Sequence, residues 1–150
     1  MQTFMPLPSF VESAAALDYR RLGKQRVEVK QLLHALGVPV GGPLPPKPSS
    51  WRNHPAARMW KGYEFNLVVY GAAMCQEWIS RGYCDSLAPQ FLEASRLFLG
   101  KPVSQPPWMG NPEFHAAHRS NLLRKLPDHY SRFGWTEPHD LPYIWPEANA

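Results

Sequence analysis

Arginine and lysine recur between Leu17 and Glu28, a stretch with carboxylates near both ends. A helical repeat of about 3.6 residues places Arg21, Lys24 and Glu28 on one face. Guanidinium and ammonium groups contact phosphate oxygens, and a carboxylate can stabilise a developing positive charge or move a proton. The pattern therefore predicts a phosphate-binding helix face with an acid at its end, formed by Arg20, Arg21, Lys24, Arg26 and Glu28.

An ordinary solvated helix would also fit this pattern, because Asp18 and Glu28 stand at spacings that allow ion pairs with these cations. Two more basic groups favour a ligand. Arg52 and Arg58 flank His54, and the stretch from His115 to Lys125 carries several further cations. Cations on separate helices would form a groove for a polyanion, which makes nucleic acid the leading ligand class.

The histidines offer weaker support for a metal site. His115 and His118 share a helix face, but no acidic residue stands at a matching spacing and His54 is remote in sequence. We therefore expect no metal and no organic cofactor. His54, His115 and His118 are instead expected either to line a site for a sugar phosphate or to be buried and hydrogen-bonded.

Composition limits the class of protein. The chain has 150 residues, 44% of them hydrophobic, which fits one compact domain. A net charge of +4 favours polyanions as partners. The two cysteines, Cys75 and Cys84, do not form a zinc motif and are expected to be reduced. No stretch reaches the roughly 18 to 20 apolar residues that span a bilayer, so we expect a cytoplasmic protein without a membrane partner.

The elements that must position these residues are predicted to be helical. Ser9 and Glu12 have the spacing of a capping box, so a first helix begins near Phe10. Asp18 suits the N-cap of a second helix, which Gly37 ends. Apolar residues then repeat at helical spacing along the chain. The repeats predict a long central helix from Pro55 to about Arg81, a less regular helix within 87–99, and a third main helix over 112–125.

Proline-rich stretches separate these helices and predict surface loops at 38–50 and 101–110. Trp108 lies in the second loop and is expected to be partly exposed. The aromatic tail from Pro127 to Ala150 carries four prolines, which favour an extended segment. The predicted fold class is all-α: a single compact domain of three main helices plus shorter ones, with proline-rich loops and an extended aromatic C-terminal tail.

The order of these motifs resembles the pyrimidine-dimer DNA glycosylase family of the phage endonuclease V type. Two strings, LGKQRVE at 22–28 and WRNHP at 51–55, are similar to a divergent bacterial and phage branch grouped with that family. The resemblance covers most of the chain and implies a single endonuclease V-like helical domain over 1–150. Its motifs are LDYRRL at 17–22, NHP at 53–55, SRGY at 80–83, the segment 115–125 and DHYSRFG at 128–134.

The family's chemistry implies roles for particular residues. Its nucleophile is the N-terminal amine, and such an amine, with an ordinary pKa of about 7.7 to 8.0, is easier to deprotonate than lysine. Gln2 is too large for the usual removal of an initiator methionine, which leaves the amine on Met1. Arg21 occupies the position that matches the family's catalytic glutamate. Glu28 is therefore the first choice for the catalytic carboxylate, and Asp18 the second.

The sequence thus predicts a DNA glycosylase with AP-lyase activity, in which an imine forms between the N-terminal amine and the sugar of a flipped-out nucleotide. Its expected partner is damaged or modified double-stranded DNA, and we expect a monomer. The alternatives are a non-catalytic nucleic-acid-binding module and an enzyme acting on a small nucleoside or phosphorylated substrate. The expected catalytic residues are Met1, Glu28 and Asp18, and the expected substrate-binding residues are Arg20, Arg21, Lys24, Arg26, His54, His115 and Arg119.

Overall fold

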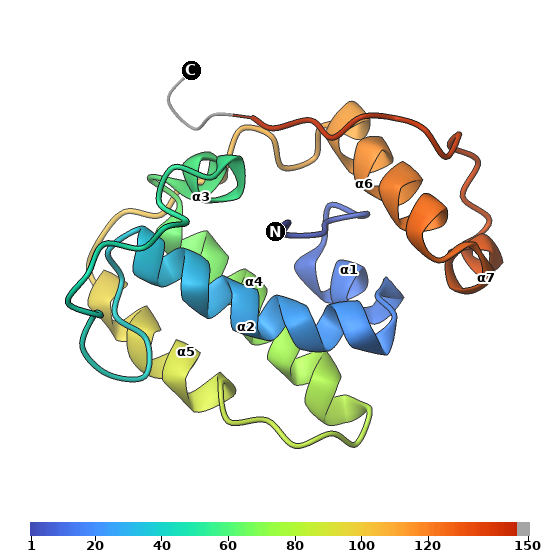
Figure 1. Ribbon diagram of the computed structural model, residues 1–150. Coiled ribbons are helices and arrows are strands. Elements are labelled where there is room, and N and C mark those ends of the chain that lie inside the picture. The colour runs from blue at the N-terminus through green and yellow to red at the C-terminus, as the bar shows by residue number, and fades with distance from the viewer. Residues whose placement is uncertain (147–150) are drawn as a thin grey trace.

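The computed structural model describes residues 1–146, which form helices joined by loops and contain no strand. This confirms the predicted all-α class and the single compact domain. Figure 1 shows the helices in chain order. The α-helices are α1 (Phe10–Ala16), α2 (Tyr19–Ala35), α3 (Pro55–Trp60), α4 (Glu64–Ser80), α5 (Ala88–Ser95), α6 (Pro112–Lys125) and α7 (Pro127–Tyr130), with short 3-10 helices at η1 (Arg96–Phe98) and η2 (Ser131–Phe133).

Local sequence signals set the predicted starts of α1, α2 and α6. Ser9 Oγ accepts a hydrogen bond from the Glu12 amide at 3.1 Å, and Asp18 Oδ2 accepts one from the Arg21 amide at 3.3 Å. The Asn111 side chain caps α6 in the same way. Gly37 follows α2 with a φ of 83°, a left-handed conformation that suits glycine. These boundaries confirm the predicted helix starts and the end of α2. Of the capping box, only the bond to Ser9 Oγ is found among the described residues.

The long central helix predicted from Pro55 to about Arg81 is wrong, because the chain breaks between α3 and α4. Gly62 stands at the break with a φ of 90°, which an α-helix does not accommodate. The apolar repeat runs through the break because both helices turn their apolar sides to the same core: Trp60 and Leu67, on either side, are fully buried. Periodicity alone therefore could not show the turn.

Two expectations for the aromatic loops also need correction. Trp108 is only 4% exposed, because its loop folds back and the ring packs edge-on against Trp60 with centroids 4.8 Å apart. The C-terminal tail begins with α7 and η2 and only then becomes extended, as far as the described residues reach. Tyr130 anchors this part, since it is fully buried and its ring stacks on Trp135.

The packing leaves the N-terminal segment between two groups of helices. In Figure 1, α2 crosses in front of α4 with α5 beside them, while α6 and α7 lie on the other side of the N-terminal segment. Gly71 allows α4 to approach closely, because a Cβ there would lie 2.7 Å from Val29 Cγ1 of α2. Residues 2–5 are buried between the two groups and form part of the core.

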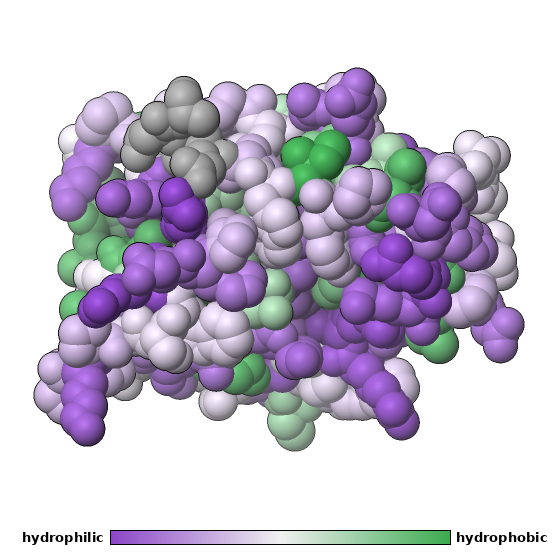
Figure 2. Space-filling model, turned by 45° about the horizontal axis from the view of Figure 1, so that its top comes forward, coloured by the Kyte–Doolittle hydropathy of each residue, from purple (hydrophilic) through white to green (hydrophobic). Residues whose placement is uncertain are grey.

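The surface is largely hydrophilic on the face shown in Figure 2, with small hydrophobic groups between the polar residues. Within residues 1–146, no helix combines the length and the apolar character that crossing a membrane requires. Cys75 is buried and Cys84 exposed, and both are free thiols, as the sequence predicted.

Candidate active site

The N-terminal segment is held on one side by polar side chains from α2 and α4. Gln25 Oε1 accepts a hydrogen bond from the Phe4 amide at 2.9 Å, and Gln25 Nε2 donates to the Gln2 carbonyl at 2.7 Å. The Tyr70 hydroxyl donates to the Phe4 carbonyl at 2.8 Å. Each of these groups is buried, so the bonds replace hydration that the segment has lost. The position of the first residues is therefore fixed by the core.

Helix α6 holds the same segment from the other side. The Met5 amide donates to His118 Nδ1 at 2.8 Å, and His115 Nδ1 lies 2.8 Å from the Met5 carbonyl, to which it donates because its Nε2 accepts from the Gly110 amide. Burial lowers the pKa of His118 to about 3, so this imidazole is neutral near pH 7. Arg119 Nη1 donates to the Pro6 carbonyl at 2.8 Å.

These contacts change the interpretation of two predicted substrate-binding residues. His115 is buried, and Arg119 also forms an ion pair with Glu137. Within the described residues, neither lines the cavity described below. The expectation that they line a substrate pocket is therefore not supported. Their polar atoms bind the protein's own first residues, so they position the segment that leads to Met1.

An open cavity of about 1040 Å³ lies where the N-terminal segment emerges. Clefts of roughly this size are typical of ligand sites. It brings together most of the residues singled out in the sequence. The predicted site residues that line it are Met1, Asp18, Arg20, Arg21, Lys24 and Glu28.

Glu28 is a buried carboxylate with one oxygen near a cation and the other without a hydrogen-bond partner among the described residues. It is buried, and its Oε1 lies 3.5 Å from Lys24 Nζ. Its Oε2 is buried without a hydrogen-bond partner among the described residues, and so is Nε2 of Gln2, another cavity residue. Burial raises the pKa of Tyr70, and the negative charge of Glu28 raises it further, which places this carboxylate near the bonds that hold Phe4. Unsatisfied buried groups in a cavity are typical of a site that a ligand completes.

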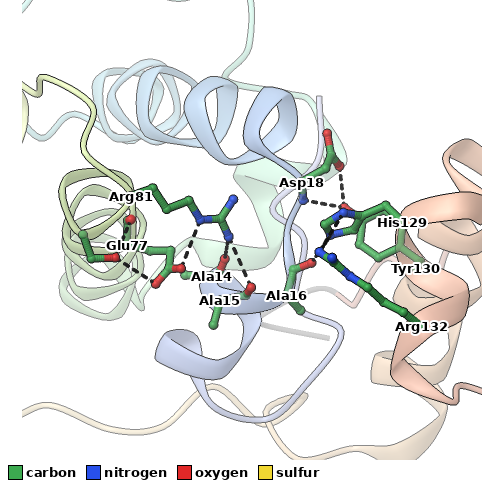
Figure 3. Close-up of polar contacts among 10 residues, drawn as sticks. Ala14, Ala15, Ala16, Asp18, Glu77, Arg81, His129, Tyr130 and Arg132 are labelled. Carbon is green, nitrogen blue, oxygen red and sulfur yellow. Dashed lines mark hydrogen bonds and ion pairs between the residues drawn. The ribbon is translucent and has the colours of Figure 1, made fainter.

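Asp18, the second carboxylate, is already hydrogen-bonded within the protein, and Figure 3 shows its contact with Tyr130. Its Oδ1 accepts hydrogen bonds from the Tyr130 hydroxyl at 2.5 Å and from Arg21 Nη1 at 3.1 Å, while Oδ2 caps α2. Burial alone would raise the pKa of Asp18, but the bonds from Tyr130 and Arg21 outweigh it and hold the pKa below its ordinary value. Asp18 therefore remains ionised and joins α2 to α7, and Glu28 is the better candidate for chemistry.

Removing the Tyr130 hydroxyl is expected to destabilise the protein. Tyr130→Phe should lower the free energy of unfolding by about 1.5–3 kcal/mol near neutral pH, the range for hydrogen bonds to charged groups. A depressed pKa in the folded state stabilises the fold above the unfolded pKa of about 3.9, and this contribution disappears as the pH falls through the folded value. The difference between wild type and variant should therefore narrow in acid.

Urea denaturation over a series of pH values measures this effect. Tyr83→Phe is the matched control, because among the described residues no hydrogen bond of the Tyr83 hydroxyl is found and Tyr83 is 42% exposed. Equal stability of Tyr130→Phe and wild type at neutral pH would show that the Asp18 contact contributes nothing.

Two cavity residues fix the end of α1 and were not predicted as site residues. Arg81 Nη2 donates to the Ala14 and Ala15 carbonyls, each at 3.2 Å, and His129 Nε2 lies 2.9 Å from the Ala16 carbonyl (Figure 3). Carbonyls at a helix end lack partners within the helix, and these side chains supply them. Arg81 and His129 therefore position the junction of α1 and α2 from opposite sides.

Cations are concentrated at the cavity. Arg21 and Lys24 share its lining with Lys125 from the end of α6, a residue that was not predicted as a site residue. Burial lowers the pKa of Lys125, and the positive charges of Arg21, Arg124 and Lys24 lower it further. Mutual repulsion of this kind is relieved by an anion, so the cluster is suited to phosphate.

Arg26 and His54 lie outside the cavity lining in the described structure. Arg26 Nη2 lies 2.6 Å from Asp85 Oδ1, and its guanidinium is 4.7 Å from the Trp78 ring centroid. The guanidinium of Arg26, which was expected to bind phosphate, is thus paired with Asp85 of the same chain. His54 caps α3 through Nδ1. Burial lowers the pKa of His54, and the positive charge of the N-terminal amine lowers it further.

Lys24 and Arg26 both lie on α2, but their removal is expected to change different properties. Removal of Lys24 should change DNA binding, and removal of Arg26 should change stability. Lys24 pairs with Glu28 at 3.5 Å, but its side chain is 75% exposed and can also contact phosphate, so Lys24→Ala should lower the salt slope of DNA binding by about one unit. Because this ion pair is long and its lysine lies in solvent, its loss should cost less than about 1 kcal/mol of stability. Arg26→Ala leaves the buried Asp85 carboxylate without its ion pair and should cost about 3 kcal/mol of stability without changing that slope.

Fluorescence anisotropy at several salt concentrations and urea denaturation measure the two effects. A reduced salt slope in folded Arg26→Ala would overturn its structural assignment.

Gln25 was also missed, although the sequence held a signal for it. It lies three residues after Leu22 and four before Val29, in the middle of the apolar stripe of α2. A polar residue at such a position must find a buried partner. The signal shows that a bond exists but not that the partners are the backbone groups of residues 2 and 4.

More than half of the chain matches the model of a known protein family. A family model described as pyrimidine dimer DNA glycosylase matches residues 1–90. The matched range includes Met1, the whole of α2 and the cavity residues up to Tyr83, whereas Lys125 and His129 lie beyond it. Neither the comparison with curated proteins nor the comparison with solved structures gives a match.

Proposed function

This chain belongs to the pyrimidine dimer DNA glycosylase family, and we propose that it removes a damaged or modified base from double-stranded DNA through the amine of Met1. One observation carries the proposal. The residues after Met1 are buried and hydrogen-bonded from α2, α4 and α6, so the first residue is held at a cavity. The same cavity contains a cluster of cations and the Glu28 carboxylate, whose Oε2 has no hydrogen-bond partner among the described residues.

The proposed reaction begins with attack on the sugar. The lone pair of the Met1 nitrogen forms a bond to C1′, the bond from C1′ to the base breaks, and the base leaves with the bonding pair and takes up a proton. Opening of the sugar ring then gives an imine between the Met1 nitrogen and C1′. Glu28 lies on the cavity wall, where its carboxylate would stabilise the positive charge that develops on the sugar.

The proposed AP-lyase step uses the same groups. The imine makes the C2′ proton acidic, and Glu28 accepts that proton. The electron pair of the broken C–H bond moves to form a double bond between C2′ and C3′, and the phosphate at C3′ leaves with its bonding pair. Water then hydrolyses the imine and restores the amine. Arg20, Arg21 and Lys24 would hold the phosphates around the extruded nucleotide.

Borohydride trapping tests the proposal. The protein is mixed with duplex DNA that contains an abasic site, and borohydride reduces any imine to a stable amine. We expect a covalent complex whose attachment maps to the Met1 nitrogen by mass spectrometry. A complex attached to Lys125 or another lysine, or no complex with DNA that is demonstrably bound, would overturn the assignment of the nucleophile.

Arg21 supports a second candidate, a non-catalytic DNA-binding module. It occupies the position where the family resemblance leads one to expect the catalytic glutamate, and its guanidinium pairs with Asp18 at 3.1 Å. In that case the cations would still bind DNA in a salt-dependent way, but no trapped complex would form.

A further inference from the structure

Three stacked aromatic rings stand beside the cavity. The Trp78 ring of α4 lies 4.2 Å from that of Tyr83 at an interplanar angle of 24°, and the Tyr83 ring lies 6.5 Å from that of Tyr19 at 26°. Trp78 is partly buried, whereas Tyr19 and Tyr83 are 51% and 42% exposed and line the cavity. We call the two exposed tyrosines the aromatic ledge.

The ledge rests on a fixed support. The Trp78 indole donates to the Cys84 carbonyl at 2.8 Å, and the Arg26 guanidinium, bound to Asp85, lies 4.7 Å from its ring centroid. Gly23 of α2 leaves room for the indole, since a Cβ there would lie 2.9 Å from two of its ring atoms. The rings are therefore held in place by α2, α4 and the loop that follows α4.

The surroundings of the ledge indicate its occupant. Arg20 and Arg21 line the same cavity, and the Arg20 guanidinium lies 5.7 Å from the Tyr19 ring centroid. Flat aromatic faces next to cations match the two parts of a nucleotide, because bases stack on aromatic rings while arginine contacts the phosphate. A paired base in a duplex is already stacked on both faces, so only an unpaired base can use the ledge.

We propose that Tyr19 and Tyr83 stack on an unpaired nucleobase of the DNA bound in the cavity. The proposal rests on the proposed function, because it takes DNA with a disrupted base pair as the ligand. It assigns to these tyrosines the preference for such sites over intact duplex. Cations alone would not provide this preference, since phosphates are present in both kinds of DNA.

Binding of two duplexes tests the ledge. One contains a tetrahydrofuran abasic analogue, which cannot form an imine, opposite 2-aminopurine, and the other is fully paired. Tyr19→Leu and Tyr83→Leu should each weaken binding to the first duplex roughly tenfold, the scale for loss of one base–aromatic stack, and leave binding to the second nearly unchanged. Tyr19→Phe and Tyr83→Phe should bind as wild type does. Phe133→Leu, at an exposed aromatic outside the cavity lining, is the matched control.

The outcomes separate the ledge from the chemistry. The ledge is overturned if the leucine variants bind the abasic duplex as wild type does, or if they weaken binding to both duplexes equally. If the phenylalanine variants lose as much affinity as the leucine variants, stacking is also overturned, because the ring is retained. Trapping on natural abasic DNA is measured separately. If wild type is trapped on natural abasic DNA but the leucine variants bind as wild type does, only the ledge proposal is overturned. If the leucine variants bind more weakly than the phenylalanine variants but no complex is trapped, only the proposed imine chemistry is overturned.

Discussion

Protein extended by two residues before Met1 is expected to form no trapped complex with abasic DNA while binding that DNA normally. Residues 2 and 4 are bound by Gln25, and residue 5 by α6, so the segment cannot slide to bring a new terminus into place. Each added residue moves the amine by as much as about 3.3–3.6 Å. Displacement of a reacting group by even about 1 Å can cost a hundredfold in rate.

A fusion cleaved to leave Gly-Ser before Met1 provides this variant, and the same two residues added after the C-terminal residue provide the control. Both proteins are compared by borohydride trapping and by anisotropy. N-terminal acetylation should have the same effect without lengthening the chain, because an amide nitrogen is not a nucleophile. Normal trapping by the extended protein would exclude the N-terminal amine as the reactive group.

Glu28→Gln is expected to slow base removal and strand cleavage by about 10²–10⁴, the usual contribution of a positioned acid or base. The amide is nearly isosteric but can neither accept the C2′ proton nor carry the compensating negative charge. Loss of that charge also leaves Lys24 without its carboxylate partner at 3.5 Å, so affinity for DNA should stay the same or rise. Single-turnover cleavage and equilibrium binding measure the two quantities.

Glu113→Gln is a suitable control for this change, because Glu113 is an exposed acid in the first turn of α6. It should leave both rates and affinity unchanged. If Glu28→Gln reduced binding and cleavage in equal proportion, Glu28 would be a structural or binding residue. Thermal unfolding of both variants shows whether the fold is retained.

Local features of the sequence predicted the helices well. Caps such as Ser9 and Asp18 act within a few residues, so their effect can be read from the sequence alone. The face formed by Arg21, Lys24 and Glu28 was also predictable, because all three lie on one regular helix and the structure places them in one cavity. The turn at Gly62 was not, since the apolar repeat continues across it.

The roles of individual polar residues depended on distant partners. Lys24 and Arg26 are both cations of one helix, yet only Arg26 meets Asp85, a residue 59 positions away. His115 and His118 were considered as site residues or as buried histidines, and their contacts with Met5 support the second alternative. Such pairings follow from tertiary packing, and no local pattern in a single sequence specifies them.

The bond between Met5 and His118 joins residues 113 positions apart in the chain. During translation the first residues leave the ribosome long before α6 has been made. Their contacts with α6 can form only after α6 has also left the ribosome. The full set of bonds that hold the N-terminal segment can therefore form only after α6 has been synthesised. An incomplete product lacking α6 would keep the bonds from Gln25 and Tyr70 to residues 2 and 4 but would lose those to residues 5 and 6. If the Met1 amine is the nucleophile, as we propose, we expect such a product to be less reactive than the complete chain.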